Sequence, residues 1–327
     1  MIDFKKLKKI IDENKSFLLT THVNPDADAI GSEIAFYLLL KKLNKKVYIV
    51  NYSATPYNLQ FLDKDKTIRK YNHARHKKYF NQVDVLVCLD FNRSNRIVSM
   101  EEDFINSNKL KICIDHHEKP QDFTNFNFID TKYCATGHII YNFIESTKIA
   151  KIDKRIADNL YAAIMTDTGS FKFEKTTPEI HLIASNLLKI GTSPTKIFDG
   201  IYDQSRFGKV KLLGIALESI KLFGKAKKIS YMKLHQSDFE KCNVDESDTD
   251  GFVNYVLSIA NVKIGVLFIE LKKGFKVSFR SKGNIKVNKL AEEFGGGGHI
   301  NAAGTRMFKQ NLDDEINKIL NRAEKYL

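Results

Sequence analysis

The alternation of short apolar segments with helical patterns constrains the fold of this chain more than any other feature. In the first half, near-continuous apolar runs occur in SFLLTTH, which begins at Ser16, in KVYIV, and at residues 83–91 and 109–115. Such runs are typical of strands that are covered on both faces. Helical patterns lie between or after them, over residues 31–43, 137–145 and 153–165. Strands alternating with helices predict an α/β domain with a mostly parallel sheet.

The second half has a different pattern. After Phe171 the sequence is mainly helical through about Gly224. A second α/β set follows, with the strand-like segments KKISYMKLH, IGVLFIEL, FKVSFRSK and AAGTRMF and a last amphipathic helix from Asp313. We therefore predict a mostly parallel-sheet α/β domain over residues 1–190, a helical linker over 191–224, and a smaller C-terminal α/β domain over 225–327.

Composition narrows the class of protein. The 327 residues carry 52 Lys and Arg against 39 Asp and Glu, and the net charge of +13 favours anionic partners such as nucleotides or nucleic acid. With 43% hydrophobic residues, the chain is neither disordered nor fibrous. No apolar run approaches the roughly 20 residues that span a bilayer, so we expect no membrane partner. The four cysteines are dispersed without a CxxC pair, which indicates reduced thiols in a cytoplasmic protein.

Acidic and imidazole side chains follow four of the predicted elements. They are His22, Asp26 and Asp28 after the first strand, Asp90 near the end of residues 83–91, Asp115, His116 and His117 after the KLKICI run, and Asp167 after the helix over 153–165. Ligands of an open α/β sheet bind beyond the carboxyl ends of its strands, so these side chains are expected to share one edge. Two of the histidines and four of the aspartates are a plausible ligand set for two metal ions.

Each segment alone has a simpler explanation. A single Asp at a strand end is commonly a turn or cap residue, and Asn24-Pro25-Asp26 could be a turn with Asp28 as a helix N-cap. Adjacent histidines are usually solvated or satisfied in the core. All four segments together are harder to explain by capping, because clustered carboxylates without cations between them cost free energy.

The mixture of donors indicates both the metal and the reaction. Carboxylate oxygen with imidazole suits Mn²⁺ or Mg²⁺, or less selectively Fe or Zn, and the lack of cysteine ligands argues against a structural zinc site. Two such ions would stabilise the attacking and the leaving oxygen of an in-line phosphoryl displacement. The predicted chemistry is phosphoester hydrolysis.

The same segments carry a resemblance to a known family. HVNPDADAIGS, LDFN, IDHH and MTDTGSF resemble the four motifs of the DHH phosphoesterase superfamily, and VSFRSKG and GGGGHINAAG resemble its DHH-associated substrate-binding domain. The likeness covers nearly the whole chain without departing from the pattern at these positions. It is greatest to the bacterial nanoRNase/pAp phosphatase group, the bifunctional oligoribonucleases and PAP phosphatases.

The resemblance implies roles for individual residues. One Mn²⁺ would be held by His22, Asp26 and Asp90, and a second by Asp28, Asp90, His116 and Asp167, so that Asp90 bridges the two ions. Mg²⁺ or another divalent ion could replace Mn²⁺. The resemblance also implies that His117 contacts the scissile phosphate or protonates the leaving oxygen, and that Asp115 orients a ligand histidine.

The second domain has its own candidate contacts. Residues 272–289 contain seven bases and no acid, and a solvated hairpin face explains most of them equally well. Arg280, which precedes Ser281, is a better candidate for a substrate phosphate because a guanidinium binds phosphate bidentately. The run Gly295 to Gly298 could be only a flexible loop, or a loop near a helix start whose N–H groups approach an anion. With the resemblance, we expect Gly296, Gly297, Gly298 and His299 to contact the substrate.

The leading hypothesis is a phosphodiesterase and phosphatase that degrades short oligoribonucleotides to mononucleotides and dephosphorylates 3′-phosphoadenosine 5′-phosphate (pAp). One alternative is a phosphodiesterase for cyclic dinucleotides or their linear products, which differs only in the substrate that the cleft holds. A second alternative is a non-catalytic nucleotide- or RNA-binding module, although such a module gains nothing from four converging carboxylates. A homodimer is possible.

Overall fold

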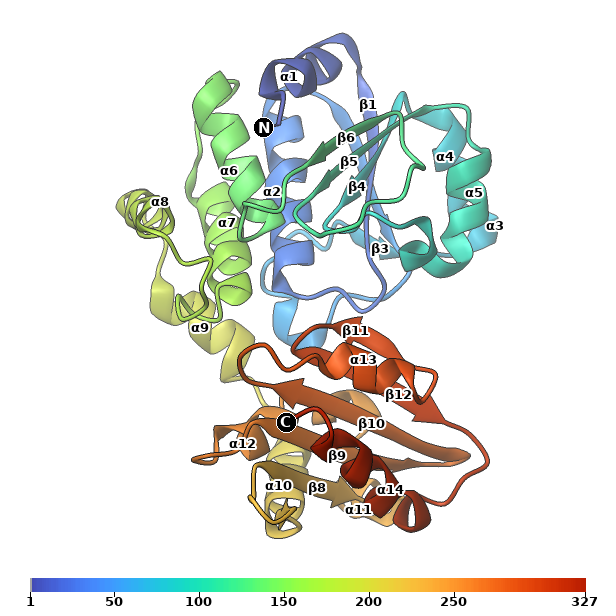
Figure 1. Ribbon diagram of the computed structural model, residues 1–327. Helices are drawn as coiled ribbons and strands as arrows, with labels where there is room; N and C mark the ends of the chain where they lie inside the picture. The colour runs from blue at the N-terminus through green and yellow to red at the C-terminus, as the bar shows by residue number, and fades with distance from the viewer. Residues whose placement is uncertain (1) are drawn as a thin grey trace. The chain divides into compact units, whose positions relative to one another are not determined.

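The computed structural model describes residues 2–327 and divides into two compact units, one ending at Gln204 and one running from Ser205 to Leu327 (Figure 1). Each unit is built around a six-stranded sheet. The stretch predicted as a helical linker is shared between them. Helix α9 (Pro194–Tyr202) belongs to the first unit and α10 (Phe207–Glu218) to the second.

The first sheet is entirely parallel, with the strand order β3-β2-β1-β4-β5-β6. Its strands are β1 (Ser16–Thr21), β2 (Lys46–Asn51), β3 (Ile68–Lys70), β4 (Val85–Leu89), β5 (Leu110–Asp115) and β6 (Phe126–Ile129). The chain proceeds outward from β1 to β3 in one direction and from β4 to β6 in the other. The order therefore switches between β1 and β4, which is where sheets of this type bind their ligands.

Helices cover both faces of this sheet, as the continuous apolar strands require. One face packs against α1 (Phe4–Glu13), α2 (Ala27–Lys42), α6 (Thr136–Thr147) and α7 (Lys154–Asp167). The other face packs against the segment that holds α4 (Tyr79–Gln82), the 3-10 turn η2 (Ser94–Met100) and α5 (Glu101–Asn106). Three more elements complete the unit: the 3-10 turn η1 (Tyr57–Leu59), α3 (His73–His76) and α8 (Pro178–Lys189).

The start of α2 differs from the expectation. The periodicity predicted a helix from residue 31, whereas α2 begins at Ala27 because the Asp26 carboxylate accepts the N–H groups of Asp28 and Ala29. The N-cap is therefore Asp26, and Asp28 lies inside the first turn.

The second sheet has the order β11-β12-β10-β9-β8-β7, and only the β8–β9 pair is parallel. Its strands are β7 (Lys221–Phe223), β8 (Ile229–Leu234), β9 (Ile264–Leu271), β10 (Gly274–Ser281), β11 (Gly297–His299) and β12 (Ala302–Met307). The other elements of the unit are α11 (Gln236–Cys242), the 3-10 turn η3 (Glu246–Thr249), α12 (Val253–Ser258), α13 (Val287–Glu292) and α14 (Leu312–Glu324). The prediction of an α/β protein with a parallel first sheet and a smaller second α/β unit is confirmed.

The glycine run is a finding of its own, because it does not lead into a helix. It follows α13 and forms the short edge strand β11, in which Gly297 pairs with Gly304 of β12. A Cβ atom at Gly296 would lie 2.2 Å from the Gly304 carbonyl oxygen, and Gly298 has a φ of 145°. Close backbone pairing therefore accounts for glycine at these two positions.

Two further features are the lack of a membrane-spanning helix and the state of two cysteines. Among the described residues, no helix is both long enough and apolar enough to cross a membrane. Cys88 and Cys113 are buried free thiols in β4 and β5.

Candidate metal centre and substrate surface

The parallel sheet brings the predicted ligands to one edge. His22 follows β1, Asp90 follows β4, and Asp115 ends β5 with His116 and His117 directly after it. The turn after β1 and the start of α2 add Asp26 and Asp28, and the last residue of α7 is Asp167. Within the described residues, three overlapping groups of these side chains are close enough to hold a metal ion. Two of them are described below, and the third consists of Asp90, Asp115, His116 and His117.

The first group consists of His22, Asp26 and Asp90, with one candidate ligand atom from each lying within 4.8 Å of the others. The Nε2 atom of His22 is 3.4 Å from Oδ2 of Asp90, and its Nδ1 atom is 2.9 Å from the Val23 carbonyl oxygen. That contact fixes the Nδ1–H tautomer, so Nε2 presents its lone pair to the cluster.

The second group consists of Asp28, His116 and Asp167. The buried Nε2 atom of His116 is 3.1 Å from Oδ2 of Asp167 and 3.6 Å from Oδ2 of Asp28. It is also 3.5 Å from Oδ1 of Asp90, which connects this group to the first.

The surroundings of His116 test whether the group fits a metal ion. Although carboxylates surround its Nε2 atom, neither ring nitrogen has a hydrogen-bond partner anywhere in residues 2–327. A buried polar atom without a partner costs free energy unless something else satisfies it. Carboxylate oxygens and an imidazole nitrogen that has no hydrogen bond converge here, and a divalent cation could be bound by all of them. These residues are therefore suited to hold a metal ion.

Helix α6 fixes the position of two of the carboxylates. The backbone N–H groups of Thr136 and Gly137 donate to the two oxygens of Asp28 at 2.7 and 3.0 Å. The Ser32 hydroxyl also donates to Asp28, and the Thr136 hydroxyl donates to Oδ1 of Asp90 at 2.9 Å. The sequence reading missed these supporting residues, since a Thr-Gly pair at a helix start carries no signal of its own.

Mutual repulsion is visible in the pKa values. Burial, followed by the charges of Asp90 and Asp167, raises the pKa of Asp26 to about 6 and that of Asp28 well above its usual range. Burial would also raise the pKa of Asp90, but its contacts with His116 and His22 outweigh burial and hold that pKa well below the ordinary value. Burial and mutual repulsion therefore disfavour the ionised forms of Asp26 and Asp28, and bound cations would favour them by neutralising the negative charge.

His117 is held differently from His116. Its Nδ1 atom is 2.8 Å from Oδ1 of the fully buried Asp115, and its side chain is 36% exposed. Burial lowers the pKa of His117, but the Asp115 hydrogen bond and nearby Asp90 raise it more, so the pKa is above the ordinary value. His117 is thus an oriented imidazole at the rim of the cluster. Asp115 contacts His117 in this structure, and the role of orienting a ligand histidine that the resemblance implied stays a prediction.

An aromatic side chain also lies near the cluster, and the sequence reading gave no sign of it. Burial raises the pKa of Tyr202 on α9, a hydrogen bond with Ser170 lowers it in part, and the charges of Asp167 and Asp26 raise it further. Its side chain remains 42% exposed. Tyr202 therefore presents a ring to solvent close to the carboxylates.

In the second unit, Arg280 and His299 lie in one row of the sheet. Both are register partners of Ala302, Arg280 from β10 and His299 from β11, so all three side chains are on the same face. Small residues surround Arg280 on this face, namely Gly265 and Ala302 opposite it and Ser278 two residues before it. Arg280 is half-buried, and helix α12 packs against this face at Gly265, where a Cβ atom would lie 3.1 Å from Cγ2 of Val256.

Ser281 points to the opposite face. Its hydroxyl donates to the Ile285 carbonyl at 2.6 Å and accepts a hydrogen bond from the Asn301 side chain. These bonds hold the turn that follows β10. Of the predicted substrate residues, Gly297 and His299 share a face with Arg280, whereas Gly296 and Gly298 supply backbone at β11.

Comparison with known proteins now decides the family. Residues 16–164 match the model of the DHH family N-terminal domain, and residues 227–327 match that of the DHHA1 domain. The chain belongs to the DHH family. The resemblance drawn from the four motifs is thereby confirmed, and the chain is a hydrolase that acts on phosphoester bonds.

Several relatives of this DHH protein match it over most of its length. A protein of Thermus thermophilus named bifunctional oligoribonuclease and PAP phosphatase NrnA is 30% identical over 310 residues, which is 92% of this chain and 87% of that protein. The protein of the same name from Bacillus subtilis is 26% identical over 313 residues, 95% of each chain.

Solved structures agree on the fold. The crystal structure of an exopolyphosphatase-related protein from Bacteroides fragilis has a TM-score of 0.94 at 31% identity, over 99% of this chain and 96% of that one. The exonuclease RecJ bound to manganese has a TM-score of 0.53 at 12% identity, over 100% and 94% of the two chains. At that identity the likeness to RecJ concerns the fold alone.

Proposed function

We propose that this DHH protein degrades very short oligoribonucleotides to mononucleotides and removes a phosphate from pAp, using two divalent cations held at the edge of the first sheet. The names of its relatives from T. thermophilus and B. subtilis support both substrates. The observation that carries the proposal is His116 Nε2, which is buried among three carboxylates without a hydrogen bond in the described chain.

The ligand sets follow the two groups of side chains. His22, Asp26 and Asp90 would hold one ion, and Asp28, His116 and Asp167 would hold the other with Asp90 shared. Mn²⁺ fits the mixture of imidazole and carboxylate best, and Mg²⁺ or another divalent ion is a possible substitute. When bound, such ions supply charge neutralisation at the phosphoryl group and lower the pKa of water.

The remaining chemistry belongs to the chain's own side chains. Asp115 accepts the Nδ1–H of His117 and so favours the form of the ring that carries a second proton, on Nε2. We assign His117 the transfer of that proton to the leaving oxygen, with Asp115 as the residue that positions it.

Residues of the second unit would bind other parts of the substrate. Arg280 offers a guanidinium for a phosphate group, while the β11 backbone and His299 contact the terminal nucleotide. Burial lowers the pKa of Arg280. A guanidinium nevertheless remains charged in proteins, so Arg280 keeps its positive charge. The buried thiols of Cys88 and Cys113 accord with a reaction in the reducing cytoplasm.

A substrate panel tests this function. Purified protein with Mn²⁺ is incubated with RNA of two to five nucleotides, pAp, cyclic di-AMP and pyrophosphate, and the products are separated by chromatography. Release of mononucleotides and of AMP supports the proposal, whereas faster turnover of the cyclic dinucleotide would replace it with the alternative phosphodiesterase. Binding without hydrolysis of any phosphoester would leave only a non-catalytic module.

A further inference from the structure

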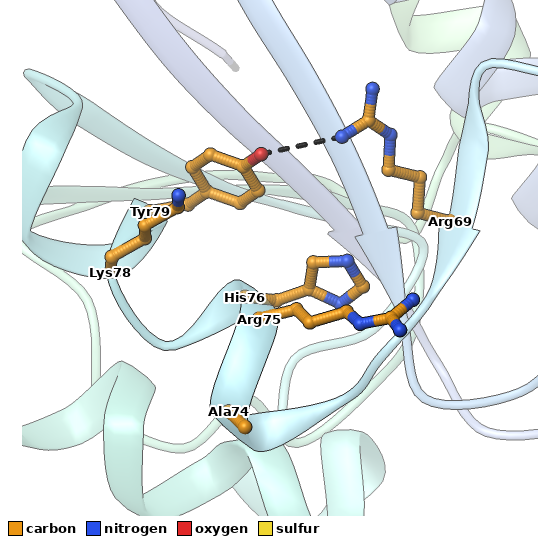
Figure 2. Close-up of a pocket in the computed structure, with 6 residues that line it drawn as sticks. All are labelled: Arg69, Ala74, Arg75, His76, Lys78 and Tyr79. Atoms are coloured by element: carbon orange, nitrogen blue, oxygen red, sulfur yellow. Dashed lines mark hydrogen bonds between the residues drawn. The ribbon is translucent and has the colours of Figure 1, made fainter.

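A second polar pocket lies on the first unit, apart from the metal cluster. It has a volume of about 640 Å³ and is lined by Arg69, Ala74, Arg75, His76, Lys78 and Tyr79 (Figure 2). These residues come from β3, α3 and the start of α4. Since β3 is the edge strand of the sheet, the pocket shares no residue with the ligand groups that follow β1, β4 and β5.

Some basic side chains of this segment lie beside a carboxylate and others do not. His73 and Lys77 lie 3.8 and 3.6 Å from the carboxylate of Asp103, which also accepts the Tyr71 hydroxyl. By contrast, the pocket cations Arg75 and Lys78 form no ion pair with a carboxylate of residues 2–327. Positive charge without a paired carboxylate therefore lines the pocket.

Aromatic contacts hold the pocket in shape. The Tyr79 ring stacks on Tyr48 with centroids 4.3 Å apart, and the Tyr79 hydroxyl accepts a hydrogen bond from Arg69 at 3.3 Å (Figure 2). The His76 ring is nearly parallel to Tyr79, and its Nδ1 atom accepts the backbone N–H of Asn72. The neutral ring therefore carries its proton on Nε2 and is a donor, like the three cations around it.

The concentration of donors has an electrostatic consequence. Burial, followed by the charges of Arg69, Arg75 and Lys78, lowers the pKa of His76. Every charge acting on this imidazole is positive, and the imidazole itself has no acceptor left once Asn72 is bonded. A pocket with several donors and no internal anion is complementary to a ligand that is rich in acceptor oxygens.

We propose that this pocket is a second anion site, which binds the pyrophosphoryl group of a nucleoside diphosphate or triphosphate. Three cations around one cavity match clustered negative charge better than the spaced phosphates of an extended strand. The volume falls in the range of small-ligand sites, which is roughly 300–1,000 Å³. The site goes beyond the proposed catalytic function, because none of its residues takes part in hydrolysis.

Calorimetric titration in the presence of EDTA tests the proposal on the full chain. Without metal the catalytic carboxylates repel anions, so binding of pyrophosphate or ADP reports other sites. We expect both probes to bind, and Arg75→Ala and Lys78→Ala each to weaken binding about tenfold. Lys77→Ala is the matched control, since Lys77 is adjacent in sequence but already paired with Asp103.

Each possible result bears on the site. Unchanged affinity in Lys77→Ala, together with the losses above, supports the pocket. No binding at millimolar probe, an equal loss in Lys77→Ala, or a loss in Arg280→Ala alone would overturn it. A five-nucleotide RNA that binds more tightly than ADP through the same residues would replace the compact site with a strand-binding surface. Hydrolysis of dinucleotides by Arg75→Ala with Mn²⁺ should equal that of the wild type, which separates this test from that of the proposed function.

Discussion

The Nδ1 atom of His117 lies 2.8 Å from Oδ1 of Asp115, and this contact joins a half-exposed imidazole to a fully buried carboxylate. The carboxylate sits at the end of β5, which is paired on both sides, so its position is fixed by the sheet. A histidine held this way keeps one tautomer and one orientation.

The first prediction concerns this pair. Asp115→Asn should lower kcat for a dinucleotide about 10²-fold with a smaller change in KM, because the imidazole loses its orientation and the stabilisation of its protonated form. Steady-state kinetics with Mn²⁺ measure both constants. His117→Asn should cost at least as much, and the double variant should be no worse than His117→Asn. Additive losses would mean that the two residues act separately.

The second prediction concerns the metal. Mn²⁺ should raise the melting temperature of the wild-type protein, since a ligand at 100 times its Kd stabilises a fold by about 2.7 kcal/mol. Asp167→Asn should abolish most of that increase and reduce hydrolysis by at least about 10²-fold, without loss of stability in EDTA, because the change also removes a charge that repels Asp26 and Asp28.

A matched control for the metal lies on the same helix. Asp158 of α7 is paired with Lys154 at 2.8 Å, away from the cluster. Asp158→Asn should keep the full response to Mn²⁺ in the same thermal assay. Loss of the response in both variants would indicate a general effect of charge on α7 instead of ligation.

The strands and the candidate ligands could both be predicted from the sequence, because the buried strands are apolar and the ligands are the polar residues at their ends. Strands such as β4 and β5 are apolar throughout because helices cover both faces, so Asp90 and Asp115 are conspicuous at their ends. Parallel pairing then brings the strand ends together whatever the details of packing. What the sequence could not supply was contact between distant segments, such as the bond from Thr136 to Asp90, 46 residues apart.

The edge strand β11 shows a second limit. A run of glycines has no side-chain alternation, so it carries no strand signal and is typical of a loop. Its pairing with β12 depends on the antiparallel register of Gly297 with Gly304, which brings two backbones close together. Strand formation at β11 is therefore decided by pairing with the neighbouring strand β12 and not by the local sequence preference.

The third prediction uses a buried acid that sequence reasoning did not single out. Glu33 of α2 is fully buried, and its Oε2 atom accepts a hydrogen bond from Asn51, whose own side chain accepts the Thr21 N–H. Burial raises the pKa of Glu33 to about 8, against the opposing effect of the Asn51 hydrogen bond. Its protonated form is therefore favoured in the folded protein.

The sign of the pH effect follows from that shift. Stability linked to Glu33 is fully present below pH 4.5, the ordinary pKa, and is lost as the pH rises through about 8. Glu33→Gln mimics the neutral form of the acid. The free energy of unfolding of this variant, relative to that of the wild type, should therefore increase between pH 5.5 and 7.5 by on the order of 1.4 kcal/mol per pH unit. Urea unfolding in EDTA measures this, with the exposed Glu102→Gln as control. A difference that does not change with pH would contradict the assignment.

The fourth prediction concerns the second sheet. Arg280→Ala should raise KM for a dinucleotide about tenfold or more and leave kcat less affected, because a phosphate contact away from the reacting bond contributes mainly to binding. Lys282→Ala is the matched control, as Lys282 is an exposed base two residues further along. Equal effects of the two changes would mean that overall positive charge, and not a specific contact, attracts the substrate.

The last prediction compares two helical glycines with opposite surroundings. A Cβ atom at the buried Gly31 of α2 would lie 2.5 Å from the Asn159 carbonyl of α7, whereas one at the exposed Gly214 of α10 would meet nothing within 4 Å. Gly31→Ala should therefore destabilise the fold by about 1–3 kcal/mol by forcing α2 and α7 apart. Gly214→Ala should stabilise it by about 1 kcal/mol, because alanine loses less backbone entropy in a helix. Denaturant unfolding of the two variants tests the close packing of α2 and α7, the helices that carry Asp28 and Asp167. An unchanged free energy of unfolding in Gly31→Ala would show that α2 and α7 are not in close contact at this position.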